Sequence, residues 1–587
     1  MDSSEKVKRI NFLKGISDFF ENQTDQNGKI FCPKDRIEHT GKNAYSIIIN
    51  SKLFQLTNND CYFKRAERIA LRVVNNFIDD PDYGYGIFYP GRLEPRNAVN
   101  TVIDGGGCVD SLVNFLLFFE KSLDNEQKNK IKHSIYRHCE EYLTIAVKEK
   151  PVPNQRLWGG TGLAAGYQVF KNKEWKKALL ESINISLREQ NSDGSFPYFP
   201  EKRRDQKMHS GITDITAYYH SRHLAFIIDI LEKIGEGNLF KKEIKKGADF
   251  LLGMYQPSGI KNISLEGKRW YWESNYEVAS HSFDIYLLTK MFSRTKEKIY
   301  QYYAAKSFQK LLEHQIKDGG IVSHFGQGHN WQCRVVWNAN LAWIAKIIEE
   351  IPVLIKHDRI KFIRLFDKAG LFKWENENYC ALIRYKKKPM NIDFGSSIGG
   401  GSLIYFGQKF NQWKNQIIWQ KWSSSSENNF IVKPKQNCLI KNLIDFIRQN
   451  KKEFRGQRWR FYVEFTGEHP FFALKKVFYE IFIKLFHQLK NEFSTQWSIE
   501  TDLKREQKNN QISLVFHGKL AKRDGTNLEN CFFSRKYRFG DKNFYLEEHL
   551  ESNQPLKSLR YYKNKNFKYQ SISNKNFIEK EKYIKFI

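Results

Sequence analysis

The segment 214–235 begins with residues that suit proton transfer. Asp214, Tyr218 and Arg222 are spaced four apart, so in a helix they share one face, and Tyr219 lies on the next face. An arginine beside a tyrosine stabilises the phenolate. Such a tyrosine suits removal of a proton next to a carboxylate, or donation of a proton to a leaving oxygen. The alternative is that these side chains pack in a core or lie on the surface. The candidate catalytic residues here are Tyr218, Tyr219 and His220.

The segment Glu273–Glu277 could handle the carboxylate of an acidic sugar. Asn275 beside a uronate carboxylate would hydrogen-bond it and stabilise the charge that develops as the neighbouring proton leaves. His281 lies one helical turn after Glu277 and is a candidate base, although a satisfied histidine in the wall of the fold fits equally well. Asn275 and His281 therefore join the candidate catalytic residues.

The same two glutamates also fit a glycoside hydrolase, in which one carboxylate acts as acid and another as base. Neighbours on one segment rarely flank a glycosidic bond from opposite sides. A hydrolase would therefore pair Glu273 or Glu277 with a more distant carboxylate, namely Asp104, Asp193 or Asp214.

Five segments combine aromatic residues with Arg, Asn and His, namely 79–106, 149–159, 190–213, 255–277 and 316–332. Aromatic faces stack on sugar rings, and Arg, Asn and His bind hydroxyls or carboxylates. Together these segments predict an extended carbohydrate cleft, and the alternative is that the aromatic rings fill a core. The candidate substrate-binding residues are Arg96, Trp158, Arg204, His209, Arg222, Trp270, Trp272, Glu273, Tyr276, Glu277, His329, Trp331 and Arg334.

The elements that would position these loops repeat along the chain. Helix-period segments near 60–78, 125–148, 173–189, 240–254 and 295–315 alternate with more apolar ones near 107–121, 160–171, 214–235, 278–292 and 333–349. A last helix near 351–369 would begin a sixth, incomplete pair. The marker Asp-Gly follows Gln190 and Gln315, and Gly259 follows Gln256 in the same place, as suits a turn after a helix. The repeat predicts an (α/α) toroid of five or six hairpins, whose loops converge on one mouth.

The C-terminal part changes to short alternating strands. We expect strands at Tyr379–Lys386, Ser402–Phe406, Gln416–Trp422, Trp459–Phe465, Ile512–His517, Phe532–Phe539 and Phe544–Glu548. Region 423–455 reads as a loop or insertion. The helical stripe at 471–489 fits a helix that covers the sheet, with a membrane-surface helix as the alternative. We expect an N-terminal extension at 1–42, a toroid at 43–370 and an antiparallel β-sandwich at 371–587.

Composition narrows the partners. The 587 residues carry 95 Lys and Arg against 65 Asp and Glu, a net charge of +30 that suits a polyanion or reflects a lysine-rich coding bias. No nucleic-acid-binding motif is evident. Seven arginines fall near the expected mouth, which favours an acidic sugar chain: Arg92, Arg96, Arg156, Arg203, Arg204, Arg269 and Arg334.

The remaining composition signals concern location and cofactors. The eight cysteines are scattered, which indicates reduced thiols. We expect a cytoplasmic protein without a signal peptide or a membrane-spanning helix. We expect no cofactor and no metal, because the spacing of His324 and His329 matches no helical metal pair.

Several short motifs carry a family resemblance. Asp193-Gly194-Ser195 followed by Tyr219-His220, with Ser534–Phe539 and Phe544–Glu548 in the C-terminal part, is similar to the heparinase II/III-type polysaccharide lyases and their six-hairpin toroid relatives. The resemblance implies an (α/α) toroid joined to an antiparallel β-sandwich. It also implies a Tyr/His acid–base pair and an Asn that neutralises a carboxylate, which map onto Tyr219, His220 or His281, and Asn275. The histidine-rich strand of that family is not evident, so its metal site is not expected here.

The sequence therefore favours a lyase that cleaves an acidic, uronate-containing polysaccharide by β-elimination, in surface-polysaccharide production or intracellular processing. Three alternatives use the same residues. A six-hairpin glycoside hydrolase would use paired carboxylates, a uronyl C5-epimerase would share the proton abstraction, and a glycan-binding or assembly protein would bind without turnover.

Overall fold

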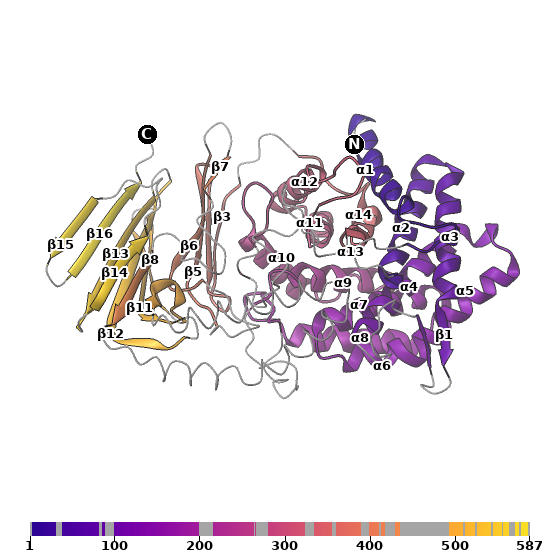
Figure 1. The fold of residues 1–587 in the computed structure, drawn as a ribbon, viewed down its shortest axis with the longest axis horizontal. Helices are drawn as coiled ribbons and strands as arrows, with labels where there is room; N and C mark the ends of the chain where they lie inside the picture. Colours follow the sequence, from indigo (N-terminus) through magenta and orange to yellow (C-terminus); the bar gives the residue numbers. More distant parts are fainter. Residues whose placement is uncertain are drawn as a thin grey trace.

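A computed structural model describes residues 3–30, 38–80, 85–88, 99–198, 215–262, 265, 280–322, 334–354, 360–388, 398–409, 413–416, 429–434, 492–499, 501–508, 511–522, 525–541, 544–553, 556–562, 570–574 and 577–584. The helices gather at one end of the molecule and the sheets at the other (Figure 1). The first helix, α1, lies in the helical part, and the last strand, β16, lies in the sheet that is farther from the helices.

An inner ring of helices forms the helical part. Each inner helix contacts the next, and the last contacts the first, so the ring is closed. The inner helices are α2 (Thr40–Thr57), α4 (Val99–Phe119), α7 (Pro153–Phe170), α9 (His220–Lys233), α11 (His281–Thr295) and the pair α13 (Arg334–Ala339) and α14 (Ala342–Ile347). The outer helices are α1 (Ser3–Glu21), α3 (Asp60–Asn75), α5 (Asn125–His138) with α6 (Thr144–Glu149), α8 (Lys173–Arg188), α10 (Lys241–Met254) and α12 (Lys298–Leu312). Within the described residues these helices make six hairpins, and each of the ten segments predicted between 60 and 349 contains a helix. The segment predicted at 214–235 is helical only from His220, because Ile215 forms an isolated β-bridge with Pro197 before the helix begins.

The sixth hairpin is not where we expected it. Residues 1–42, taken as an extension, contain α1 and the start of α2, and these two helices complete the ring. Arg9 of α1 donates from Nη1 to the Ile348 carbonyl at 2.8 Å, which joins the first hairpin to the last. The helix predicted at 351–369 is wrong, because Phe362–Phe366 forms strand β3 and pairs with a second strand.

The turns after four of the outer helices, α1, α8, α10 and α12, share one arrangement. Their glycines have positive φ, namely Gly28 at 77°, Gly194 at 93°, Gly259 at 85° and Gly319 at 85°. A Cβ on Gly319 would collide with the Gly15 carbonyl of α1, and one on Gly194 would collide with the Lys246 carbonyl of α10. Only glycine fits both the backbone angle and the close approach. Helix α1 therefore packs against the Gly319 turn in the same way as α10 packs against the Gly194 turn, so α1 is a member of the repeat.

Aromatic side chains fill the axis of the ring. Phe226 of α9 lies 5.1 Å from Trp343 of α14 and 5.4 Å from Trp158 of α7 between ring centroids, and Phe283 of α11 lies 5.3 Å from Trp343. Helices α9 and α14 are not neighbours in the ring, so these contacts cross its interior. We call these four residues the aromatic layer.

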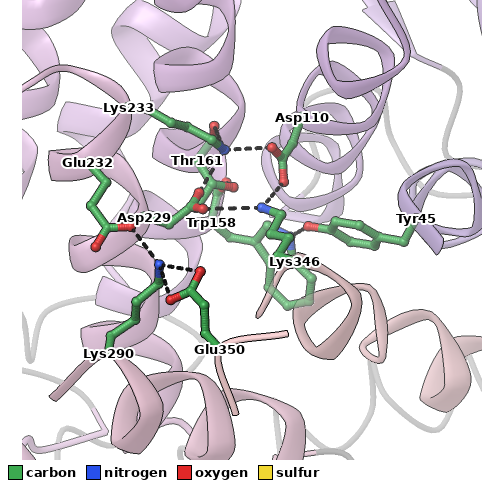
Figure 2. Close-up of polar contacts among 10 residues, drawn as sticks. All are labelled: Tyr45, Asp110, Trp158, Thr161, Asp229, Glu232, Lys233, Lys290, Lys346 and Glu350. Atoms are coloured by element: carbon green, nitrogen blue, oxygen red, sulfur yellow. Dashed lines mark hydrogen bonds and ion pairs between the residues drawn. The ribbon is translucent and has the colours of Figure 1, made fainter. Parts of the chain in front are cut away.

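Towards the C-terminal ends of α9 and α14 lies a layer of charged side chains (Figure 2), in which the two carboxylates are buried and the two lysine side chains are 13% exposed. Asp110 of α4 contacts Lys233 of α9 at 2.6 Å and Lys346 of α14 at 2.7 Å, and Asp229 contacts the same two lysines at 2.7 and 3.3 Å. Burial alone would raise the pKa of Asp110, but the two lysines outweigh it and the pKa lies below its ordinary value. We call these four residues the charge layer.

The C-terminal part contains two antiparallel sheets in the described residues. The five-stranded sheet runs β3 (Phe362–Phe366), β4 (Leu371–Glu375), β5 (Tyr379–Arg384), β6 (Ser402–Lys409) and β7 (Trp413–Gln416). The nine-stranded sheet has the order β14 (Leu556–Tyr562), β8 (Asn429–Pro434), β9 (Phe493–Ser494), β11 (Gln511–Ala521), β12 (Asn527–Phe539), β13 (Phe544–Ser552), β16 (Phe577–Ile584) and β15 (Gln570–Asn574), with β10 (Asp502–Lys508) paired to β11. A separate pair, β1 (Phe77–Asp80) and β2 (Tyr85–Phe88), lies in the helical part.

Apolar side chains of the two large sheets form one cluster. Phe372 lies 5.3 Å from Phe539, and Phe406 lies 5.0 Å from Phe544, so the sheets face each other. The strands predicted near 379, 402, 512, 532 and 544 are confirmed. The loop predicted at 423–455 is wrong at β8, and the features predicted at 459–465 and 471–489 lie outside the described residues.

One stretch in the described part of the chain, Val102–Ser122, is long and apolar enough to cross a membrane by length and composition. Its most apolar window is 78% buried inside the structure, where it forms α4 of the inner ring. Core helices of this kind pass the same test as membrane spans.

Candidate functional site

The N-terminal ends of the inner helices meet at one end of the ring, which is the expected mouth. Side chains from five of the helices gather there, and we call them the mouth cluster: Lys42, Asp104, Trp158, Tyr218, Arg222 and Phe283. Tyr218 stands just before α9, and the others lie within the first two turns of their helices.

Arg222 is at the centre of this cluster. Its Cζ lies 4.1 Å from the ring centroid of Tyr218, 4.9 Å from Phe283, 5.3 Å from Tyr219 and 6.0 Å from Trp158. The residue is only 4% exposed. A guanidinium among aromatic faces away from water is a strong local source of positive charge.

Lys42 brings a second cation into the mouth cluster. Its Nζ lies 3.7 Å from the Trp158 ring centroid and 3.8 Å from Asp104 Oδ1. The Lys42 and Asp104 side chains are 13% and 11% exposed, so both keep some contact with solvent. Among the described residues, the mouth cluster thus brings together two cations, Lys42 and Arg222, and one carboxylate, Asp104.

The two adjacent tyrosines occupy different surroundings. Tyr218 packs beside Arg222 and is 6% exposed. Tyr219 is half-buried and packs against Tyr198 at 5.5 Å and Tyr218 at 4.7 Å between ring centroids. The structure therefore brings Tyr218, Arg222 and Trp158 together, although Tyr218 lies in the turn before α9 and not on the helix face that we expected.

His220 points away from the mouth cluster. Its Nε2 bonds with the Gly247 carbonyl of α10 at 2.7 Å, and its ring lies 4.9 Å from Phe250. Burial lowers the pKa of His220 to about 4. A neutral imidazole in this position packs between the inner helix α9 and the outer helix α10, away from the mouth cluster.

His281 has a similar setting one hairpin further on. Its Nε2 bonds with the Gly259 carbonyl at 3.1 Å, and the side chain is fully buried. Burial lowers the pKa of His281 to about 3. The sequence left two roles open for His281, a base or a hydrogen-bonded histidine in the wall of the fold. The contacts of His281 fit the second role.

Trp158 and two of the expected arginines also differ from their expected roles. Trp158 lies inside α7, which begins at Pro153 where we expected a loop, and it is 4% exposed beneath Lys42, so its ring offers no open face to a sugar. Arg156 is fully buried and pairs with Glu189 at 2.6 Å. Arg334 forms two bonds with Asp318, at 2.5 and 2.9 Å, at the seam between the last hairpin and the first.

Asp193 is excluded as a partner carboxylate of a hydrolase. One of its oxygens accepts from Ser195, and the other accepts from the Ala369 backbone N–H at 2.7 Å. Both oxygens therefore serve the turn after α8 and its junction with the sheets. Of the carboxylates considered from the sequence, the described residues place Asp104 in the mouth cluster.

The other predicted site residues lie outside the described residues: Arg96, Arg204, His209, Asp214, Trp270, Trp272, Glu273, Asn275, Tyr276, Glu277, His329 and Trp331. Within the described part, no group of three or more His, Cys, Asp and Glu could hold a metal ion. Sequence reasoning missed Lys42 and Phe283. The signal for Lys42 is its place one turn into α2, a helix that begins inside the segment taken as an extension.

In the described residues, the closed ring of six hairpins, followed by two antiparallel sheets, defines an (α/α)-toroid protein. No protein-family model and no curated protein matches the chain.

Solved structures similar to it include a polysaccharide lyase (15% identity, 60% of this chain and 99% of that one, TM-score 0.45) and a sugar epimerase from a ruminal bacterium (12%, 58% and 98%, TM-score 0.45). A glycosyl hydrolase of family 88 from Bacteroides vulgatus is similar at 13% identity over 60% of this chain and all of that one, with a TM-score of 0.42. At these identities, and with TM-scores below 0.5, the likeness assigns neither a family nor an activity to this chain.

Proposed function

We propose that the protein is a lyase that cleaves an acidic, uronate-containing polysaccharide by β-elimination at the mouth of the toroid. The observation that carries this proposal is the Arg222 guanidinium 4.1 Å from the Tyr218 ring at the mouth of the helical ring. In this proposal the helical ring is the catalytic domain, and the two facing sheets form the β-sandwich expected from the sequence.

The cations of the mouth cluster account for the substrate class. Lys42 and Arg222 place two cationic side chains at the mouth, and a cation attracts the carboxylate of an acidic sugar. A bound carboxylate next to a cation makes the proton on the neighbouring carbon easier to remove, because the charge that develops is stabilised. Asn275 stays the proposed amide partner of that carboxylate.

Tyr218 is the proposed base, because the Arg222 cation stabilises its phenolate. The phenolate takes the proton from the carbon that bears the carboxylate. The electron pair left behind forms a carbon–carbon double bond, and the glycosidic bond one carbon further breaks. The leaving oxygen takes up a proton, so the products are an unsaturated uronate and a free hydroxyl.

The test is incubation with a panel of uronate-containing polysaccharides, followed by ultraviolet absorbance of the unsaturated sugar. We expect absorbance to rise, and Tyr218→Phe to lower kcat by about 10²–10⁴-fold. Arg222→Met should lower kcat/KM at least about a hundredfold. Tyr219→Phe is the matched control and should keep most of the activity. If Tyr219→Phe abolishes the reaction and Tyr218→Phe does not, the choice of base is wrong.

A glycoside hydrolase is the second candidate, favoured by the position of Asp104 beside Lys42 in the mouth cluster. It predicts new reducing ends without the unsaturated absorbance, and their loss in Asp104→Asn. Exchange of solvent deuterium into the polysaccharide without cleavage would instead identify an epimerase. Tight binding with no turnover would leave a glycan-binding protein.

A further inference from the structure

Lys373 of β4 is a charged side chain with no access to solvent. Its Nζ donates to the Leu252 carbonyl at 2.9 Å and to the Tyr255 carbonyl at 2.8 Å. Both carbonyls lie at the C-terminal end of α10, where a helix leaves its last carbonyls without partners. A cation there also interacts favourably with the helix dipole. The sheet region therefore supplies the cap of an outer helix of the toroid.

The charge of Lys373 is balanced inside the same site. Glu375, 2% exposed at its side chain, lies 2.7 Å from Lys373 Nζ, and Tyr303 of α12 donates to Glu375 at 2.5 Å. Lys373 also lies within 3.0 Å of the Tyr303 hydroxyl. Buried charges persist when they are paired and hydrogen-bonded, as these are. The arrangement is fixed on both sides of the junction between sheet and toroid.

The residue whose backbone Lys373 holds reaches on towards the mouth. The Tyr255 hydroxyl donates to Asp284 Oδ2 at 3.0 Å, and Lys261 contacts Asp284 Oδ1 at 3.0 Å. Asp284 is fully buried in the first turn of α11. The residue before it, Phe283, is the mouth-cluster ring 4.9 Å from the Arg222 guanidinium. A chain of contacts thus joins the sheet to Arg222 and runs from Lys373 through Tyr255, Asp284 and Phe283.

We propose that Lys373 is a positioning residue for the mouth, acting through Tyr255 and the first turn of α11 on the seat of Arg222. The consequence for catalysis rests on the proposed function, whereas the positioning itself does not.

The test compares Lys373→Met, Tyr255→Phe and the double variant in the full chain. Hydrogen exchange is measured at the amides of the first turn of α11, with the amides of α4 as an internal reference. We expect each single variant to speed exchange at α11 by about tenfold or more and to leave α4 unchanged. Because both substitutions break one chain, the double variant should add little to the larger single effect. Lys386→Met, which removes an exposed ion pair with Asp367 in the same sheet region, is the control.

Kinetics give the readout that a purely structural role would not move. With a polysaccharide that the wild type cleaves, kcat should fall by about tenfold or more in both single variants, and KM should change less, because the reacting groups are displaced. Unchanged exchange at α11 in Tyr255→Phe, which removes only a hydroxyl, would overturn the inference, as would additive effects in the double variant. If no polysaccharide is cleaved, the proposed function fails while the exchange result still decides the positioning.

Discussion

The charge layer gives the sharpest stability prediction. Asp110 contacts both Lys233 and Lys346, and Asp229 contacts the same two lysines, so the four charges balance in a buried site that joins α4, α9 and α14. Asp110→Asn keeps the size of the side chain and removes its charge. Two ammonium groups, each on a side chain that is 13% exposed, are then left with one carboxylate between them.

Removing one partner from a buried ion pair costs about 3–5 kcal/mol, because the remaining charge stays desolvated without compensation. A loss of about 4 kcal/mol corresponds to a fall of about 3 °C in Tm if all 587 residues unfold together. The double variant Asp110→Asn/Lys346→Met restores the balance with one acid and one lysine. It should therefore be more stable than Asp110→Asn alone.

The assay is urea unfolding followed by circular dichroism, for the wild type, each single variant and the double variant. Glu529→Gln is the control, because its pair with Lys519 is exposed and should contribute less than about 1 kcal/mol. If Asp110→Asn costs no more than Glu529→Gln, the charge layer does not stabilise the ring. A double variant that loses the sum of its two single losses would refute the argument from charge balance.

Two further predictions concern the repeat and the wall histidines. Gly319→Ala should destabilise the ring by at least about 2 kcal/mol, because φ is 85° and the added carbon meets the α1 backbone, whereas Gly237→Ala, with open space around it, should be neutral in thermal unfolding. The pKa values of His220 and His281, about 4 and about 3, lie below that of an unfolded histidine, so the unfolded chain binds the extra protons and stability falls as pH drops from about 6.5. Each histidine should cost about 2–3 kcal/mol at about pH 4.5, and unfolding in urea should show that His281→Gln is less sensitive to acid; equal sensitivity would contradict the assignment.

The repeat could be predicted from the sequence because the backbone of each turn requires one residue type, glycine. A positive φ beside a neighbouring backbone demands glycine, so Gly194, Gly259 and Gly319 mark their turns. Helix α1 left a weaker trace. It buries Arg9 and Ser17 together with its apolar residues, a pattern that makes sense only once the ring closes.

The site was less accessible to sequence reasoning. The contact between Tyr218 and Arg222 was expected from helical spacing, which is local, although Tyr218 lies in the turn before α9. Lys42 over Trp158 did not, because a lysine is ordinarily solvated and the two residues are far apart in the chain. The same limit applies to His220 and His281, whose bonds to carbonyls of neighbouring hairpins depend on tertiary packing.

Because side chains fill the axis of the ring, they limit the path that a long substrate could take. Phe226 and Trp343 meet across the ring, and beyond them Asp110 and Lys346 bridge it again. If the proposed function holds, a polymer cannot pass through the toroid from one end to the other. A chain must then lie across the mouth or enter it by one end, and its fragments must leave by the same mouth. Release of the fragments would compete with the chemical step in setting the turnover rate.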